Sequence, residues 1–170
     1  YAAGELKLNC VKFMLERASE DVITAATKDG NAFHFAIAAN VDDAETFTEI
    51  FGILLASALD PNVKNEVSCD TPLHVAARFG NVAAATLLVE YDGINLDIQN
   101  CEWSDTPLIL AAKRRKWDVM RLLLKNGADK DIRNTDTQNG EFPEGSKAED
   151  YVADFPEAAI FLDPEDVFRR

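Results

Sequence analysis

A segment of the sequence and its imperfect copy constrain the fold more than any other feature. TPLHVAARFGN, residues 71–81, returns as TPLILAAKRRK, residues 106–116, which lies 35 positions further along the chain. Weaker copies begin at Asn31 and Lys147, so successive copies are 40, 35 and 41 residues apart. A unit of this size buries its apolar face by stacking on its neighbours. The repetition therefore predicts a stacked scaffold rather than a catalytic motif that is used twice.

The residues that open each copy predict the start of a helix. Thr71 and Thr106 stand where a hydroxyl can accept from the free backbone N–H groups of a first turn. Pro72 and Pro107 follow directly, in a position where the missing N–H of proline costs nothing. Each TPL sequence is therefore expected to begin a helix.

The rest of each unit predicts a second helix that packs against the first. Alanine pairs at 76/77 and 111/112 remove bulk where two helices approach closely. Gly80, Gly93 and Gly127 fall at expected helix ends, where a positive φ is needed. The apolar stripe of the second helix is supplied by leucines. These are Leu87, Leu88, Leu122, Leu123 and Leu124.

These patterns resemble the ankyrin repeat family, whose unit is about 33 residues long. The resemblance covers about residues 2–162 and implies an all-α solenoid of stacked antiparallel helix pairs with β-hairpin-like finger loops. It also implies that His34 and His74 are structural clamps, which bond their own turn to the next repeat. We expect a single domain over 1–170. Its approximate units are a partial repeat at 1–28, then 29–65, 66–100 and 101–134, and a degenerate C-terminal cap at 135–170.

Charge and composition exclude several classes of function. Thirty acidic residues against seventeen basic ones give a formal net charge of −13, which argues against binding to nucleic acid or anionic lipid. No run of apolar residues reaches the length of a membrane span. The N-terminal YAAGELKLNCVKF lacks the order of a secretory signal, and its first residue, Tyr1, suggests a piece of a longer chain.

The cysteines and the absence of catalytic motifs favour an intracellular binding protein. Cys10, Cys69 and Cys101 are odd in number and have no metal-ligand spacing, so we expect free thiols in a reducing cytoplasm. KRRK, residues 113–116, also resembles a minimal nuclear-import signal. No nucleophile with a spaced histidine, zinc motif or phosphate loop is found. We expect a monomer that binds protein, with no enzyme activity, cofactor, metal or small-molecule substrate.

The resemblance places partner contacts on the first helices and the finger tips, which together form a concave face. The residues after each alanine pair include Arg78 and Phe79, then Lys113 and Arg114, followed by Arg115. The finger sequences NEVSCD, 65–70, and NCEWSD, 100–105, add Trp103, Asp70 and Asp105 to the candidate surface.

This composition suggests a groove for an acidic or phosphorylated protein segment, because arginine and tryptophan are enriched among binding hot spots. Two alternatives stay open at this stage. The basic turn can be a solvated surface that offsets nearby acids. The domain can also be the regulatory region of a larger enzyme, channel or secreted pathogen effector, acting through an intramolecular or host-protein contact. Arg115 raises a further question, because it stands in the position that glycine, Gly80, holds one repeat earlier.

Overall fold

A computed structural model of the chain describes residues 28–38, 44–57, 59–135, 145–153 and 155. Residues 1–27 of the expected partial repeat and most of the expected C-terminal cap at 135–170 lie outside these residues. Six α-helices and one short 3-10 helix are found in the described part, in which no strand is assigned. They are α3 (Ala32–Ala38), α4 (Ala44–Leu55), α5 (Pro72–Phe79), α6 (Val82–Val89), α7 (Pro107–Lys113), α8 (Trp117–Lys125) and η2 (Ala148–Tyr151).

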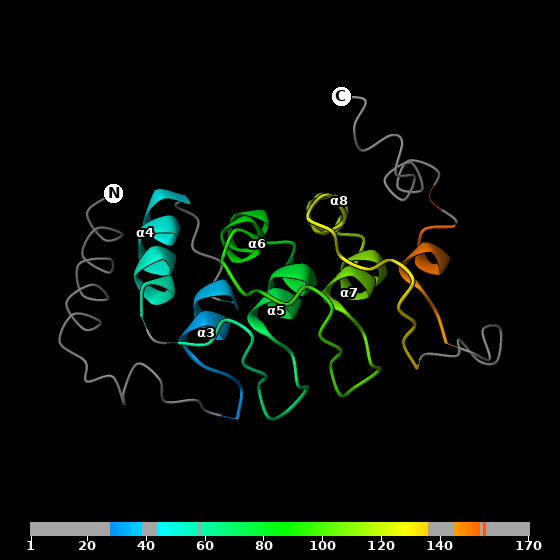
Figure 1. Cartoon of the computed structure of the whole chain (residues 1–170), viewed down its shortest axis with the longest axis horizontal. Helices are drawn as coiled ribbons and strands as arrows, with labels where there is room; N and C mark the ends of the chain where they lie inside the picture. Colours follow the sequence, from blue (N-terminus) through cyan, green and yellow to red (C-terminus); the bar gives the residue numbers. More distant parts are fainter. Residues whose placement is uncertain (1–27, 39–43, 58, 136–144, 154, 156–170) are drawn as a thin grey trace.

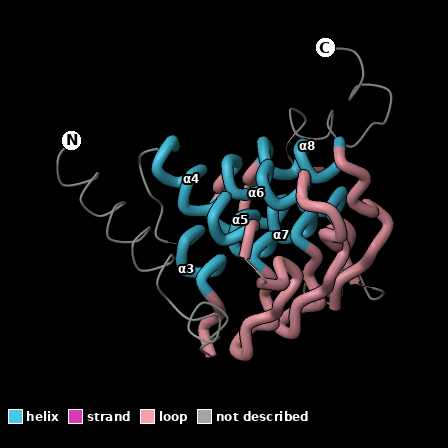
Figure 2. Tube along the Cα trace, turned by 60° about the vertical axis from the view of Figure 1, so that its left-hand side comes forward, coloured by secondary structure: helices cyan, strands magenta, loops and turns pink. Residues whose placement is uncertain are grey.

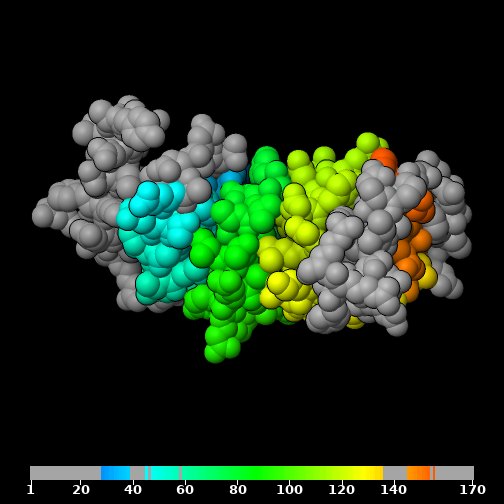
Figure 3. Space-filling model, turned by 90° about the horizontal axis from the view of Figure 1, so that it is seen from above, coloured from blue at the N-terminus to red at the C-terminus, as the bar shows by residue number. Residues whose placement is uncertain are grey.

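The helices form two rows that follow the chain along the molecule. Helices α3, α5, α7 and η2 make one row, and α4, α6 and α8 make the other (Figure 1). Within the rows, α5 packs against α3 and α7, while α6 packs against α4 and α8. Finger loops project on the side of the first row, away from the second (Figure 2). Seen from above, the units succeed one another in chain order along the long axis (Figure 3). The expected all-α solenoid of stacked helix pairs is confirmed.

The core lies between the two rows of helices and runs through all the stacked pairs. The ring of Phe51 in α4 packs at a tilt against that of Phe33 in α3, with ring centroids 5.2 Å apart. Leu73, Leu88 and Leu123 are fully buried in the later pairs. Each such side chain contributes roughly 1.5–3 kcal/mol when it leaves water. The alanine pairs of α5 and α7 are buried as well, which lets neighbouring helices approach closely.

The helix caps follow the sequence prediction. Thr71 Oγ1 accepts from the backbone N–H of His74 at 3.4 Å, and Thr106 Oγ1 accepts from that of Ile109 at 3.2 Å. Gly80 ends α5 with a φ of 74°. The threonine caps and the glycine stop predicted from the repeated segment are confirmed.

Backbone hydrogen bonds close each finger and join it to the next. Asn65 N–H donates to the carbonyl of Asp70 at 2.9 Å, and Asn100 N–H donates to that of Asp105 at the same distance. Between fingers, Cys101 N–H donates to the carbonyl of Ser68 at 2.9 Å. These bonds hold the fingers side by side at one edge of the solenoid. None of the helices in the described residues is long and apolar enough to cross a membrane.

Candidate functional site

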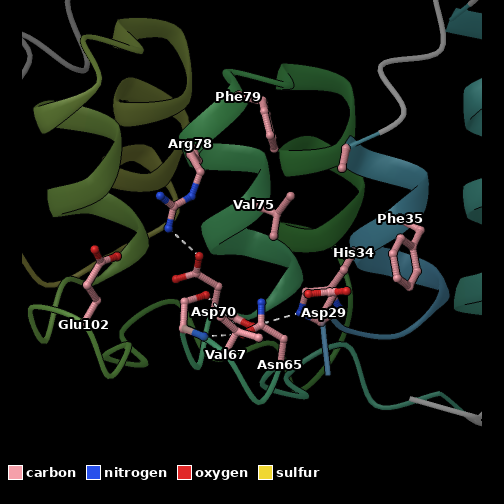
Figure 4. A pocket seen from close by; sticks show the side chains of 12 residues that line it. Asp29, His34, Phe35, Asn65, Val67, Asp70, Val75, Arg78, Phe79 and Glu102 are labelled. Carbon is pink, nitrogen blue, oxygen red and sulfur yellow. Dashed lines mark hydrogen bonds and ion pairs between the residues drawn. The ribbon is translucent and has the colours of Figure 1, made fainter. Parts of the chain in front are cut away.

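A hollow of about 360 Å³ lies on the finger side of the first two described helix pairs. Its walls come from α3, from α5, from the fingers that precede these helices and from Glu102 of the next finger (Figure 4). Phe35, Phe79 and Val67 line it and are 48%, 53% and 69% exposed. We call this hollow the concave groove. Large apolar side chains that remain exposed together around a hollow are typical of a binding site.

The groove gathers these side chains from different positions of the repeated unit. Phe35 of α3 and Val75 of α5 hold the same place after the histidine of each unit. Val75 is buried whereas Phe35 is exposed, so the ring projects into solvent at the groove. Phe79 is the last residue of α5, and Val67 lies in the preceding finger. Three separate elements therefore supply the apolar wall.

Two of the predicted binding residues, Asp70 and Asp105, lie below the surface. They are 3% and 2% exposed. Arg78 Nη2 lies 2.5 Å from Asp70 Oδ2, as the dashed line in Figure 4 shows, and Lys113 Nζ lies 3.1 Å from Asp105 Oδ2. The expectation that both aspartates face a partner is therefore corrected: burial places them where they hold the two cations rather than contact another protein.

Asparagine side chains link these aspartates from finger to finger. Asn100 Nδ2 donates to Asp70 Oδ1 at 2.9 Å, and Asn134 Nδ2 donates to Asp105 Oδ1 at 2.6 Å. Asn100 Oδ1 in turn accepts from the backbone N–H of Asp105 at 3.0 Å. Every buried side-chain nitrogen and oxygen among the described residues has a hydrogen-bond partner. The fingers are therefore joined by a satisfied polar network, which sets the spacing of the groove wall.

Histidines add a second link between consecutive units. The Nε2 atoms of His34 and His74 lie 2.9 Å from the carbonyls of Asp70 and Asp105. Thr71 N–H donates to Nδ1 of His74 at 3.1 Å, so Nε2 of this ring carries the proton and donates. Burial lowers the pKa of both histidines, and the bonds to the aspartate carbonyls oppose that shift. The clamp role implied by the family resemblance is confirmed for both.

The remaining predicted residues lie on α7, in the turn that follows it and in the finger that precedes it. The Lys113 ammonium lies 5.7 Å from the ring centroid of Trp103 and 5.3 Å from that of Tyr151. Trp103 is about half exposed at its finger tip. Arg114 is exposed, and its side chain has no hydrogen-bond or ion-pair partner among the residues that the structure describes. Arg114 is therefore the predicted cation that is best placed to meet a partner.

Arg115 keeps the turn that glycine forms one repeat earlier. Its φ is 56°, close to the 74° of Gly80. Lys116 N–H donates to the carbonyl of Ala111 at 2.9 Å, just as Asn81 N–H donates to that of Ala76. The guanidinium of Arg115 lies 4.4 Å from the ring centroid of Phe155. The turn therefore retains its shape, and this cation–π contact offsets part of the cost of a positive φ.

The cysteines differ from the sequence-based expectation. Cys69 and Cys101 form a disulfide between two neighbouring fingers, with Cα atoms 5.2 Å apart. The expectation of free thiols is therefore wrong for this pair, because stacking brings residues 32 positions apart to adjacent finger tips. Cys10 lies outside the described residues. No group of three potential metal ligands is found in the described part of the chain.

The sequence reasoning missed Phe35 and Val67. Phe35 carried a usable signal, because it is the largest residue at a position where the next units have Val75 and Leu110. Val67 carried a weaker signal, as an apolar residue at a finger tip whose counterpart one repeat later is Glu102. Neither residue can be identified as a binding candidate without knowing which face of the stacked units is exposed.

The sequence matches the family described as ankyrin repeats over residues 43–134, with three copies of the repeat. Alpha-latroinsectotoxin-Lt1a of Latrodectus tredecimguttatus is 31% identical over 103 residues, which are 61% of this chain and 7% of that protein. Alpha-latrocrustotoxin-Lt1a of the same spider is 31% identical over 123 residues, which are 72% of this chain and 8% of that protein.

A mouse protein is also similar to part of this chain. Ankyrin repeat and SOCS box protein 11 of Mus musculus is 33% identical over 87 residues, which are 51% of this chain and 25% of that protein. The chain thus matches less than a tenth of each of the two spider proteins and a quarter of the mouse protein.

Proposed function

The chain belongs to the ankyrin repeat family, whose repeats indicate a protein–protein interaction module, and from this premise we propose that its concave groove binds a partner segment. The segment that fits best joins an apolar side chain to acidic or phosphorylated residues. The observation that carries the proposal is the exposure of Phe35, Val67 and Phe79 around one hollow. The proposed role is that of a monomeric, non-catalytic binding module.

The apolar wall supplies the anchor of the interaction. Aromatic side chains dominate interface energetics when a partner covers them. Phe35 and Phe79 lie on two neighbouring helices that pack together, so a single inserted side chain can contact both walls. Val67 adds apolar surface from the finger side. An apolar partner residue would therefore displace water from three exposed side chains at once.

The charge along the first row of helices favours the α7 end for the acidic part of the proposed partner. Arg114 holds the same position after α7 that Phe79 holds at the end of α5, and these two helices are neighbours. The cation of Arg78 is matched by buried Asp70, whereas Arg114 has no such partner among the described residues. A carboxylate or phosphate next to the apolar anchor would meet Arg114, and charge-assisted bonds to arginine are among the strongest polar contacts.

Acidic residues at the groove restrict where the partner's acids can lie. Asp29 and Glu102 are exposed and line the hollow itself. Like charges placed opposite each other cost several kcal/mol at an interface, so the acidic residues of the partner belong at the α7 end and not in the hollow. The proposed partner motif is therefore directional, with the anchor at α3 and α5 and the acids at α7.

A second candidate is that the groove binds a segment of its own polypeptide. The observation that favours it is the short span of the match, since the chain corresponds to under a tenth of the two latrotoxins and a quarter of the mouse protein. A domain of this kind can regulate an attached enzyme, channel or secreted effector by an intramolecular contact. Both candidates use the same groove and predict the same type of bound segment.

Selection from a random peptide display library tests the proposal without a known partner. The wild-type chain is expected to enrich peptides in which one aromatic or aliphatic residue is followed by Asp or Glu. Phe79→Ala should weaken binding of the selected peptides at least tenfold, because a central aromatic anchor is worth about 2 kcal/mol or more. Arg114→Glu should weaken them by a similar factor, and less at high salt.

Matched control variants lie on the opposite row of helices. Val82→Ala removes an exposed apolar side chain from α6, and Lys125→Glu reverses a charge at the end of α8. Arg114 follows the last residue of α7, and Lys125 is the last residue of α8. Each charge reversal therefore places a negative charge at the C-terminal end of a helix dipole. Neither control should change peptide affinity. Selected peptides without acids, or equal binding by Phe79→Ala, would refute the proposal.

A further inference from the structure

The Cys69–Cys101 disulfide joins two fingers that both contribute to the concave groove. Val67 and Ser68 come from the first of these fingers and Glu102 from the second. Each of the three is within two residues of a bonded cysteine. The cross-link therefore lies at the groove wall and not at a remote part of the scaffold.

Noncovalent bonds hold these fingers mainly at their bases. Asn100 bonds to Asp70, and Lys64 Nζ donates to the carbonyl of Gln99 at 2.8 Å. Nearer the tip, one backbone bond joins Cys101 N–H to the Ser68 carbonyl. Val67 is the most exposed large apolar residue in the described part of the chain. The disulfide adds a covalent link to the neighbouring finger two residues from Val67.

The turn at the tip does not itself need the disulfide. Cys69 has a φ of 54°, and Ser104, which holds the same position one finger later, has a φ of 56° without a cross-link. Reduction should therefore leave the finger's conformation intact while it frees one tip from the other. The fold and the state of the groove can in this way respond separately to redox conditions.

From these observations we infer that the Cys69–Cys101 disulfide controls partner binding, with the oxidised groove as the high-affinity form. The inference rests on the proposed binding function of the groove. It also assigns the working protein to an oxidising compartment, in place of the reducing cytoplasm expected from the cysteine count, because disulfides persist where oxidants prevail.

The chemistry of the switch is thiol–disulfide exchange. On oxidation each of the two thiols loses one proton and one electron, and the sulfur–sulfur bond forms. The two electrons and two protons pass to a disulfide oxidant such as oxidised glutathione, which leaves as two thiols. Two molecules of reduced glutathione, or one dithiol, reverse the reaction. Cys101 is exposed, so such a reagent can reach the bond.

The first test measures the redox state and the finger tips. Under denaturing, non-reducing conditions, iodoacetamide should modify Cys10 alone in the oxidised chain and all three cysteines after reduction. Hydrogen exchange of the Cys101 amide should quicken at least threefold on reduction. The Asn100 amide, which bonds within its own finger to Asp105, serves as the internal reference and should not change.

The second test measures binding of a library-selected peptide to the oxidised chain, to the chain reduced with dithiothreitol, and to a Cys69→Ser, Cys101→Ser variant. Reduction should weaken peptide binding three- to tenfold. The double variant should bind with the affinity of the reduced chain, and dithiothreitol should not change that affinity. Equal affinity in all three overturns the inference, as do two free thiols at these positions in the chain isolated without reductant. A chain that selects no peptide in either redox state instead overturns the proposed function.

Discussion

Replacing Asp105 by alanine should strongly destabilise the fold, because this buried carboxylate holds two neighbouring side chains in place. Its Oδ atoms accept from Lys113 Nζ at 3.1 and 3.4 Å and from Asn134 Nδ2 at 2.6 Å. The backbone of Asp105 joins the network separately, through two bonds with Asn100 and one with His74, and those three bonds survive the change. Only the contribution of the carboxylate is therefore removed.

The magnitude follows from what each partner retains. Breaking a buried ion pair costs about 3–5 kcal/mol when the remaining charge is left uncompensated. The Lys113 side chain is 18% exposed and keeps two aromatic rings nearby, so part of its charge remains solvated. Asn134 keeps its bond to the Tyr151 hydroxyl at 3.0 Å. We therefore expect a loss at the lower end of the range, about 3 kcal/mol.

Urea unfolding of four chains measures this value: the wild type, Asp105→Ala, Lys113→Met and the double variant. The double-mutant cycle should give a coupling energy of about 2 kcal/mol between the two side chains. Glu102→Ala, an exposed acid in the same finger, is the control and should stay within about 0.5 kcal/mol of the wild type. A loss below about 1 kcal/mol for Asp105→Ala, or a coupling energy near zero, would refute the structural role.

Two further predictions concern the histidine clamp and the core. Burial lowers the pKa of His74 from its ordinary 6.5, so the unfolded chain binds a proton more readily than the folded chain does. The free energy of unfolding should therefore fall as the pH drops below 6.5, by at most about 1.4 kcal/mol per pH unit. Urea midpoints at successive pH values should show this slope, and it should be weaker in His74→Gln; a slope unchanged in that variant would assign the proton uptake elsewhere. Leu123→Ala should cost about 2–5 kcal/mol in urea unfolding, because Leu123 is fully buried, whereas Trp103→Ala, at a half-exposed tip, should cost less than about 1 kcal/mol; the reverse order would contradict the burial assigned to these side chains.

The fold was predictable because the signals that specify it are local and repeated. Thr71 and Thr106 predict the start of their helices, because an N-cap hydrogen bond involves only residues that are close in the sequence. The leucine stripe follows from helical periodicity alone. The disulfide was not predictable in the same way, because Cys69 and Cys101 hold different positions in their own units and meet only after the fingers stack.

The candidate site was predictable in part, since the repeat fixes a residue's position but the neighbouring elements fix its exposure. Phe79 and Trp103 were expected at the surface and are exposed there. Phe35 shares its position with Val75, yet only Phe35 is exposed, so position alone could not identify it. Asp70 was expected at the surface because it ends a finger, but the next finger covers it through Asn100.

A comparison between the units shows which basic residues belong to the scaffold and which are available for binding. The ion pairs Asp70–Arg78 and Asp105–Lys113 each join an acid to a base eight positions later. The first and last units lack both members of the pair. The position of the aspartate is held by Gly30 and Ser146, and the position of the base is held by Ala38 and Asp154. The acid and the base thus occur together or not at all, as expected if each base is retained to neutralise a buried aspartate. Arg114 stands outside this pattern, so its charge is not required by the scaffold. Reversal of Arg114 should therefore affect partner affinity with little loss of stability, whereas substitutions at Arg78 or Lys113 change both quantities together.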